Sequence, residues 1–151
     1  MASSDTSDTR ASASERRVLV VADESCLHSN LCRITAEHVE GAQARVLVVA
    51  PALNKRLRHY VSDTDQAAQR ATAVLDDTLA CMRDAGLTAQ GEVGDADPLA
   101  AIDDSLADFT ADEILLATHP DDELNWLERG VVEETRRRFA LPVTHVTVPT
   151  P

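Results

Sequence analysis

Residues 17–22 (RVLVVA) and 44–50 (ARVLVVA) decide the fold, because each is a short, continuous apolar run rich in valine. Runs of this kind are typical of strands that are buried on both faces of a parallel sheet. A third such run, EILLA, lies at residues 113–117. We therefore predict that these three strands occupy the interior of one parallel sheet.

Two further strands show a different pattern. Residues 87–93 (LTAQGEV) alternate apolar and polar side chains, and residues 143–148 (VTHVTV) alternate valine with threonine and histidine. Alternation is typical of a strand with one wetter face, which places both strands at the edges. With right-handed crossovers, these edges give a five-stranded parallel sheet of order 3-2-1-4-5.

Helical periodicity fills the stretches between the strands. We expect helices at about residues 25–39, from near residue 62 to a stop at Gly86, from an N-cap at Asp97, and after Gly130. The third has Pro98 at its first position, as helix starts favour. On one face it should carry Leu99, Ile102, Leu106 and Phe109. Alternating strands and helices predict an α/β fold, a Rossmann-like three-layer α/β/α sandwich.

Length and composition bound the domain organisation. A chain of 151 residues corresponds to one ordinary domain, which we place at residues 16–151. Residues 1–15 (MASSDTSDTRASASE) are rich in Ser, Thr and Asp, and have too little apolar surface to offset the entropy of ordering them. We expect this segment to be a disordered tail.

Charge and hydropathy exclude several classes of partner. The chain has 26 acidic and 14 basic residues, a formal charge of −12, so nonspecific binding to nucleic acid or to an anionic membrane is unfavourable. No apolar run is long enough to span a bilayer, and no signal peptide pattern is visible. We expect a cytoplasmic protein. Its three cysteines, an odd number without CxxC spacing, favour reduced thiols.

The predicted strand order also locates a cleft. The chain reverses direction in the sheet between the first and fourth strands, and ligands of open α/β sheets bind beside such a reversal, at the carboxyl ends of the strands. Asp23 and residues 117–120 follow those two ends. They should frame the binding cleft, if the protein has one.

Four segments between residues 18 and 148 resemble the universal stress protein family. VLVVADES (18–25) resembles its first strand, VLVVAP (46–51) its second, GDADPLAAI (94–102) its third-strand exit, and LPVTHVTV (141–148) its closing strand. Nucleotide-binding members of that family carry G-x-x-G, nine residues, then G-[ST] after the fourth strand. The resemblance implies that a nucleotide would contact Ala22, Asp23, Val49, Leu116, Thr118 and Gly130.

This chain keeps the spacing of that motif and changes its residues. It reads Ala117-Thr118-His119-Pro120, nine residues (DDELNWLER), then Gly130-Val131. Ala117 adds a Cβ where the backbone should approach phosphate, Pro120 removes an N–H, and Val131 replaces a hydroxyl. Residues 121–123 add three negative charges. We therefore expect the cleft to reject ATP.

The sequence then favours a non-enzymatic module of the universal stress protein type, without a cofactor, that acts in stress response through homodimerisation or contacts with a protein partner. The alternative is a sensor of ATP, AMP or another small ligand, with Asp23 on the base or sugar and Gly130 near a single phosphate. We predict no catalytic residues. We also predict no metal site, since His119 has no second histidine at ligand spacing.

The last strand predicts a partner. Residues 143–151 (VTHVTVPTP) form an uncharged, alternating edge that can pair with another strand. The resemblance implies dimerisation through this strand. We predict a homodimer with antiparallel fifth strands and with Val146 and Val148 near the axis.

Overall fold

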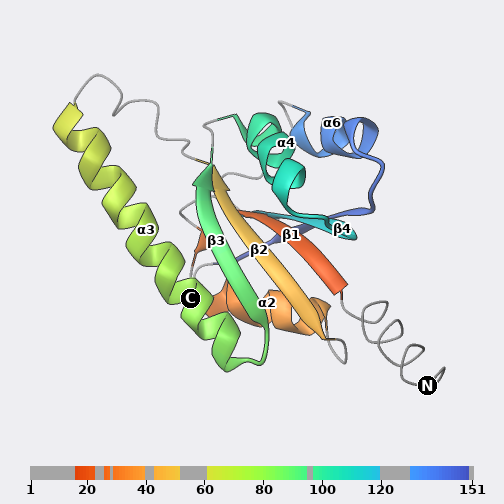
Figure 1. The fold of residues 1–151 in the computed structure, drawn as a ribbon, viewed down its shortest axis with the longest axis horizontal. Coiled ribbons are helices and arrows are strands. Elements are labelled where there is room, and N and C mark those ends of the chain that lie inside the picture. Colours follow the sequence, from red (N-terminus) through yellow and green to blue (C-terminus); the bar gives the residue numbers. More distant parts are fainter. Residues whose placement is uncertain are drawn as a thin grey trace, which may run out of the picture.

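The computed structural model describes residues 16–22, 26–27, 29–39, 43–51, 61–94, 97–119 and 130–149, so the predicted tail at 1–15 lies outside the described residues. Strands and helices alternate along the chain (Figure 1). The elements are β1 Arg16–Ala22, α2 Ser29–His38, β2 Ala44–Pro51, α3 Val61–Asp84, β3 Thr88–Gly94, α4 Pro98–Asp108, β4 Glu113–Thr118, α6 Val131–Arg138 and β5 Val143–Thr147.

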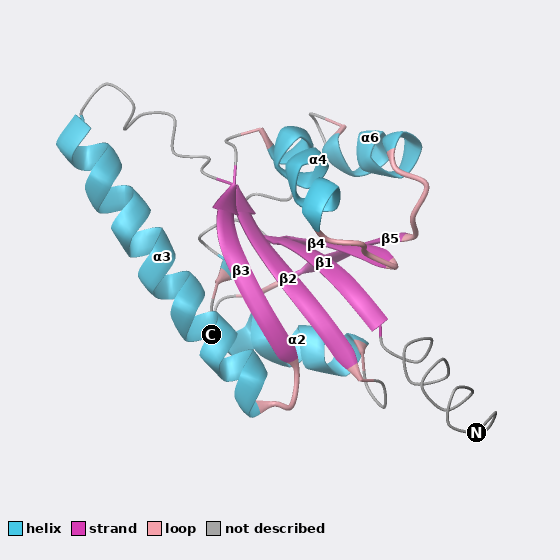
Figure 2. Cartoon of the chain, in the orientation of Figure 1, coloured by secondary structure: helices cyan, strands magenta, loops and turns pink. Residues whose placement is uncertain are grey.

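The five strands form one sheet of order β3-β2-β1-β4-β5, in which every pair of neighbours is parallel. This confirms the predicted order and the two predicted edges. Figure 2 shows β3 at one side of the sheet and β5 beyond β4 at the other. The interior strands β1 and β4 are buried along most of their length, as their continuous apolar runs require.

Helices cover both faces of the sheet, which makes the three-layer α/β/α arrangement. Val18 and Val20 of β1 face the cluster under α2 and α3, whereas Leu19 and Val21 face the cluster under α4 and α6. The period of two along the strand thus divides the valine-rich run between two cores. Figure 1 shows α2 and α3 on one side of the strands and α4 and α6 on the other.

Two helix ends follow the sequence signals closely. After α3, the amide of Gly86 donates to Arg83 O and the amide of Leu87 to Met82 O, both at 3.0 Å. This is a Schellman motif, and the positive φ of Gly86, +92°, is the conformation that it requires. At the start of α4, Oδ1 of Asp97 accepts from the amide of Leu99 at 3.0 Å, which confirms the predicted N-cap.

Some local predictions are wrong. The first helix begins at Ser29 and not near residue 25. Cys26 and Leu27 lie outside this helix. On α4, Ile102 and Phe109 are buried as predicted, but Leu99 and Leu106 are only half-buried. Leu106 still packs against the same cluster, and smaller side chains share the buried face of the helix; they are Pro98, Ala101 and Ser105.

The edge strands also differ from the simplest reading of their patterns. Val93, which the alternation of β3 turns inward, is 37% exposed near the end of that strand. On β5, residues 143–146 are all half-buried, so its threonine and histidine are no wetter than its valines. Both faces of β5 are therefore partly covered. Among the described residues, no helix is long and apolar enough to cross a membrane.

A buried acid joins three elements at the amino ends of the strands. Glu113, at the start of β4, is 8% exposed. Its carboxylate accepts from the Arg16 guanidinium of β1, with Nε at 2.9 Å, and lies 2.5 Å from Nε2 of His38 at the end of α2. Arg16 also donates to the carbonyl of His38 at 3.3 Å. This cluster lies at the end of the sheet opposite the predicted cleft.

Candidate functional site

The carboxyl ends of β1 and β4 are adjacent in the sheet, as the predicted reversal requires. Ala22 pairs in register with Ala117, and Val21 pairs with both Leu116 and Val49. Of the residues that the family resemblance implied, four lie in β1, β2 and β4 and are almost fully buried; they are Ala22, Val49, Leu116 and Thr118. Asp23 lies outside the described residues, as do Pro120 and residues 121–129.

Apolar side chains fill the layer between these strand ends and α6. Val131, the first residue of α6, is 4% exposed and belongs to the same cluster as Val49 and Leu116. The resemblance implies a hydroxyl at this position in nucleotide-binding members of the universal stress protein family, where this chain has an isopropyl group. The Val131 side chain therefore offers no hydrogen-bond donor to a ligand, because it is apolar and packs in the core.

The polar atoms at the end of β4 have partners within the chain. The Thr118 hydroxyl and Nε2 of His145 on β5 share a hydrogen bond of 2.8 Å. The carbonyl of Thr118 accepts from the amide of Val148 at 2.8 Å, and Sγ of Cys26 lies 3.7 Å from the carbonyl oxygen of Ala117. A ligand that used these atoms would have to displace existing hydrogen bonds.

Gly130 lies at the start of α6, where the sequence predicts a helix. It is the N-cap of α6 with φ 71° and ψ 23°, a left-handed conformation that favours glycine. It makes no side-chain capping bond, and a Cβ built on it would meet nothing within 4 Å. The helix start itself is therefore open around this residue.

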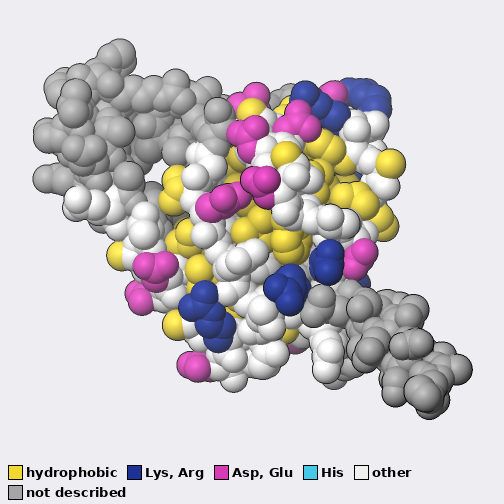
Figure 3. Space-filling model, viewed as in Figure 1, with side chains coloured by type: hydrophobic (Ala, Val, Ile, Leu, Met, Phe, Trp, Pro, Cys, Tyr) yellow, Lys and Arg dark blue, Asp and Glu magenta, His cyan; other side chains and the backbone are white. Residues whose placement is uncertain are grey.

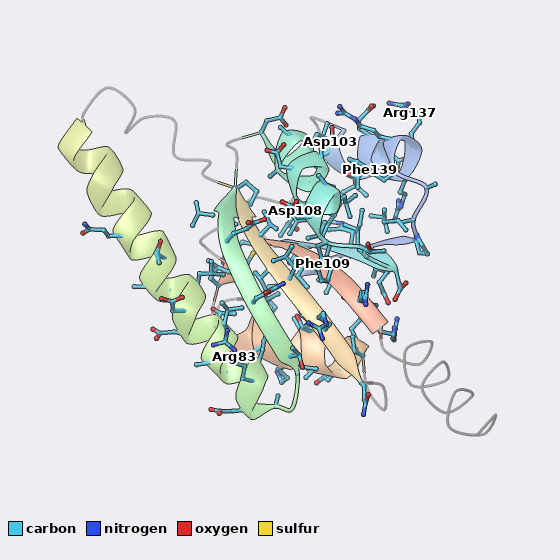
Figure 4. The ribbon with its side chains drawn as sticks, in the orientation of Figure 1. Arg83, Asp103, Asp108, Phe109, Arg137 and Phe139 are labelled. Carbon is cyan, nitrogen blue, oxygen red and sulfur yellow. The ribbon has the colours of Figure 1, made fainter. Side chains whose placement is uncertain are left out.

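The charges on α6 oppose an anion at that start. Glu133 and Glu134 lie in the first turn, and Arg136, Arg137 and Arg138 lie in the last, which confirms the predicted pairing with the helix dipole. Both acids contact arginines of their own helix. Arg138 reaches α4, where it donates to Asp103 at 3.2 Å; Figure 4 shows Asp103 and Arg137 on neighbouring helices. Arg136 and Arg137 thus offset the charges of Glu133 and Glu134, and only Arg138 is directed to another helix.

No other group in the described residues makes a stronger site. Within them, no three His, Cys, Asp or Glu side chains could hold a metal ion together. A shallow surface depression is lined by a single helix face of α3, with Gln69, Thr72, Ala73 and Asp76, all exposed. On the side of the molecule in Figure 3, hydrophobic side chains lie among scattered acidic and basic ones. The predicted acid cluster beside His119 lies outside the described residues.

The predicted dimer strand is an edge strand, and its two named valines face their own core. Val148 is fully buried in the cluster under α2 and α3, and Val146 packs against the same cluster. Asn30 of α2 donates to the carbonyl of Pro149 at 2.8 Å, which fastens the segment after β5 to the body. Any pairing along this edge would therefore use backbone groups and leave both valines in place.

The sequence did not indicate the Thr118–His145 contact. The signal that could have suggested it is the register of β4 and β5, in which Leu116 pairs with His145 and Thr118 with Thr147. That register places Thr118 and His145 on the same face, on adjacent strands. No periodicity in one segment carries this information.

Comparison with known proteins gives the chain no family. No family model matches it, and no curated protein matches it.

Proposed function

We propose that the protein is a non-enzymatic module of the universal stress protein type, which does not bind ATP and acts in stress response through self-association or a protein partner. The strand order β3-β2-β1-β4-β5 supports this proposal, because three of the four resembling segments contain strands of one parallel sheet and the fourth begins at the end of β3. The fold alone does not define a function, so the argument depends on the site.

One observation carries the proposal: Val131 is buried in the apolar cluster that also holds Leu116 and Val49. A triphosphate at this helix start needs backbone amides, a hydroxyl and a surrounding free of negative charge. Here the hydroxyl is absent, and Glu133 and Glu134 already occupy the first turn of α6. A carboxylate close to a phosphate disfavours it by about 1 kcal/mol in water, and the ion pairs of these two acids with Arg136 and Arg137 reduce that repulsion.

Isothermal titration calorimetry with ATP and Mg²⁺ tests the proposal. We expect no binding heat from the unchanged chain, and micromolar affinity would contradict the proposal. The matched variant restores the family motif with Ala117→Gly, Pro120→Gly and Val131→Ser. A gain of binding in this variant alone would show that these three positions account for the loss.

Self-association is proposed through the outer edge of β5, where Arg136 already donates to the carbonyl of Val143 at 3.4 Å. The strand is uncharged, with residues Val143–Thr147, and its outer backbone groups have no neighbouring strand among the described residues. Light scattering of the full chain at tens of micromolar should give the mass of a dimer, and dilution should return the monomer. A monomer throughout this range would contradict the self-association.

A second candidate function, a small-ligand sensor, is favoured by Gly130. It has a left-handed backbone at the start of α6, and no described residue lies within 4 Å of a Cβ built there, so this helix start is the candidate position for a small anion. A thermal shift assay with AMP, ATP and cyclic nucleotides separates the two functions. A ligand that binds the folded state raises Tm, whereas the first proposal expects no shift.

A further inference from the structure

Each outer edge of the sheet receives an arginine from the helix that precedes the edge strand. On β3, Arg83 of α3 donates from Nε and Nη2 to the carbonyl of Ala89, at 3.0 and 2.8 Å. On β5, Arg136 of α6 donates to the carbonyl of Val143 at 3.4 Å. An edge strand presents backbone groups to which another strand can bond, so these two arginines bear on association.

The carbonyl of Ala89 points away from the sheet. Just before β2, the carbonyl of Gln43 accepts from the amide of Arg16 at 2.8 Å, so odd-numbered residues of β2 turn their backbone groups toward β1. Even-numbered residues such as Val46 therefore turn toward β3. Val46 is in register with Ala89 and bonds to the residues on either side of it. The backbone groups of Ala89 thus face outward, and by the same alternation so do those of Val93.

Arg83 fully occupies this outward carbonyl. The two guanidinium nitrogens bond to the same oxygen, and they use both of its lone pairs. The helix turn is itself fixed, because the amide of Gly86 donates to the carbonyl of Arg83 at 3.0 Å in the Schellman motif. Figure 4 shows Arg83 at the end of α3 beside the strands. A second strand could bond to Ala89 only after displacing the guanidinium.

The edge at β5 is held less tightly. The amide of Ile114 donates to the carbonyl of Pro142 at 2.9 Å, so the backbone groups of the next residue, Val143, face outward. The bond from Arg136 to this carbonyl is longer than an ordinary hydrogen bond. Arg136 also contacts Glu133 at 3.4 Å, and it keeps that ion pair when it leaves the strand.

We propose that Arg83 blocks the outer edge of β3 against a second copy of this chain, so that copies join only through β5. Each copy that pairs through β5 still presents its β3 edge. If that edge paired as well, the sheet would grow copy after copy without closing. The part played by β5 rests on the self-association proposed above, whereas the blocking of β3 depends on the Arg83 contact alone.

The β3 edge is otherwise suited to pairing with itself. An antiparallel pair centred on Gly91 brings the carbonyl of Ala89 opposite the amide of Val93 in the second copy. The same pair sets Glu92 opposite Gln90, so no like charges meet across it. Val93 is 37% exposed, and pairing would cover part of this apolar surface. The guanidinium stands where the first of these bonds would form.

Sedimentation velocity of the full chain at tens of micromolar tests the proposal. Arg83→Ala is compared with Arg33→Ala, which removes an exposed arginine of α2 that contacts Glu37 of the same helix at 3.3 Å. Both variants lose one positive charge, and alanine favours the helix at both positions. We expect the mass of Arg83→Ala to rise with concentration to about twice that of the unchanged chain or more. Arg33→Ala should keep the mass of the unchanged chain, and equal masses in the two variants would overturn the proposal.

A second substitution identifies the edge that pairs. Val93→Pro removes an outward N–H and leaves the bonds between β2 and β3 in place. Added to Arg83→Ala, it should return the mass to that of the unchanged chain. Arg83 also lies in the last turn of α3, where a base complements the helix dipole. Loss of that role alone would lower Tm without a change in mass. Association that persists in the double variant would mean that copies meet elsewhere, contrary to the proposal.

The two proposals fail in different ways. A monomeric unchanged chain would contradict self-association through β5, but Arg83→Ala should still form dimers through β3. If Arg83→Ala loses its circular dichroism signal, the comparison is made with Arg83→Gln. Glutamine has helix propensity close to that of arginine and a single side-chain nitrogen, so it cannot replace both guanidinium bonds. A folded Arg83→Gln chain with the mass of the unchanged chain would refute the blocking role.

Discussion

Replacing Glu113 by glutamine should destabilise the protein far more than the same change at an exposed acid. Glu113 is 8% exposed and its carboxylate contacts the Arg16 guanidinium and the His38 ring. Glutamine keeps the size of the side chain and one acceptor oxygen, but it removes the negative charge. The substitution therefore tests the electrostatic contribution of this cluster with little change in packing.

The structure sets the size of the effect. Hydrogen bonds to charged groups contribute about 1.5 to 3 kcal/mol each, and a partly exposed partner lowers this value. The Arg16 side chain is 39% exposed and can turn to water, whereas that of His38 is 22% exposed. We expect Glu113→Gln to lower the free energy of unfolding by about 2 kcal/mol, which corresponds to about 4 to 8 °C in Tm for a chain of this length.

Urea denaturation followed by circular dichroism measures this difference. The matched control is Glu133→Gln on α6, because the Glu133 side chain is 76% exposed and contacts Arg136 at 3.4 Å. The control should cost no more than about 0.5 kcal/mol. Equal losses in the two variants would refute the reasoning, since they would mean that the buried cluster contributes no more than a surface ion pair.

Three further predictions concern single side chains. The hydroxyl of Thr35, buried in α2, has no hydrogen-bond partner among the described residues, so Thr35→Val should raise the free energy of unfolding in urea by about 1 kcal/mol. Thr78→Val should give no such gain, because that hydroxyl donates to its own helix at 3.0 Å. Gly86→Ala should lower Tm and cost about 1 to 2 kcal/mol, since φ is +92° there; an unchanged Tm would argue against the Schellman turn. Burial raises the pKa of Cys32 from 9.0 to about 12, so above pH 9 the unfolded chain binds fewer protons than the folded chain. The stability present below pH 9 should therefore fall by up to about 1.4 kcal/mol per pH unit until about pH 12. Chemical unfolding across this range should show a smaller slope for Cys32→Ala, and identical slopes would contradict the prediction.

The sequence was sufficient for the order of the strands. The continuous apolar runs of β1, β2 and β4 predict an interior position, and the alternation in β3 and β5 predicts the edges. A strand that is buried on both faces has a continuous apolar sequence, whereas a strand that is buried on one face alternates apolar and polar residues. Either pattern can be recognised within the strand itself, without knowledge of distant contacts. The end of α3 at Gly86 and the start of α4 at Asp97 were predictable for a similar reason, because capping depends on a few neighbouring residues.

The packing of α4 was less predictable. Its sequence offers Leu99 and Leu106 as well as Ile102 for burial. The structure buries Ala101 and Ser105 more fully than either leucine, although Leu106 also packs against the core. A helix that packs closely on a sheet favours small side chains at the contact. The number of apolar residues on one helix face does not predict how closely the helix will approach the sheet. The start of α2 at Ser29 is a comparable case, since the chain first makes a different turn at Cys26.

Fold class, strand order and two of the helix ends were thus written in local patterns, each within about ten residues of chain. Only the tertiary structure decided which distant side chains meet: Thr118 with His145, and Glu113 with Arg16 and His38. These contacts depend on the register between strands and on how the crossover helices lie against one another. Neither the register nor the helix packing produces a periodic pattern in the sequence, because each depends on how the side chains of two whole elements fit together.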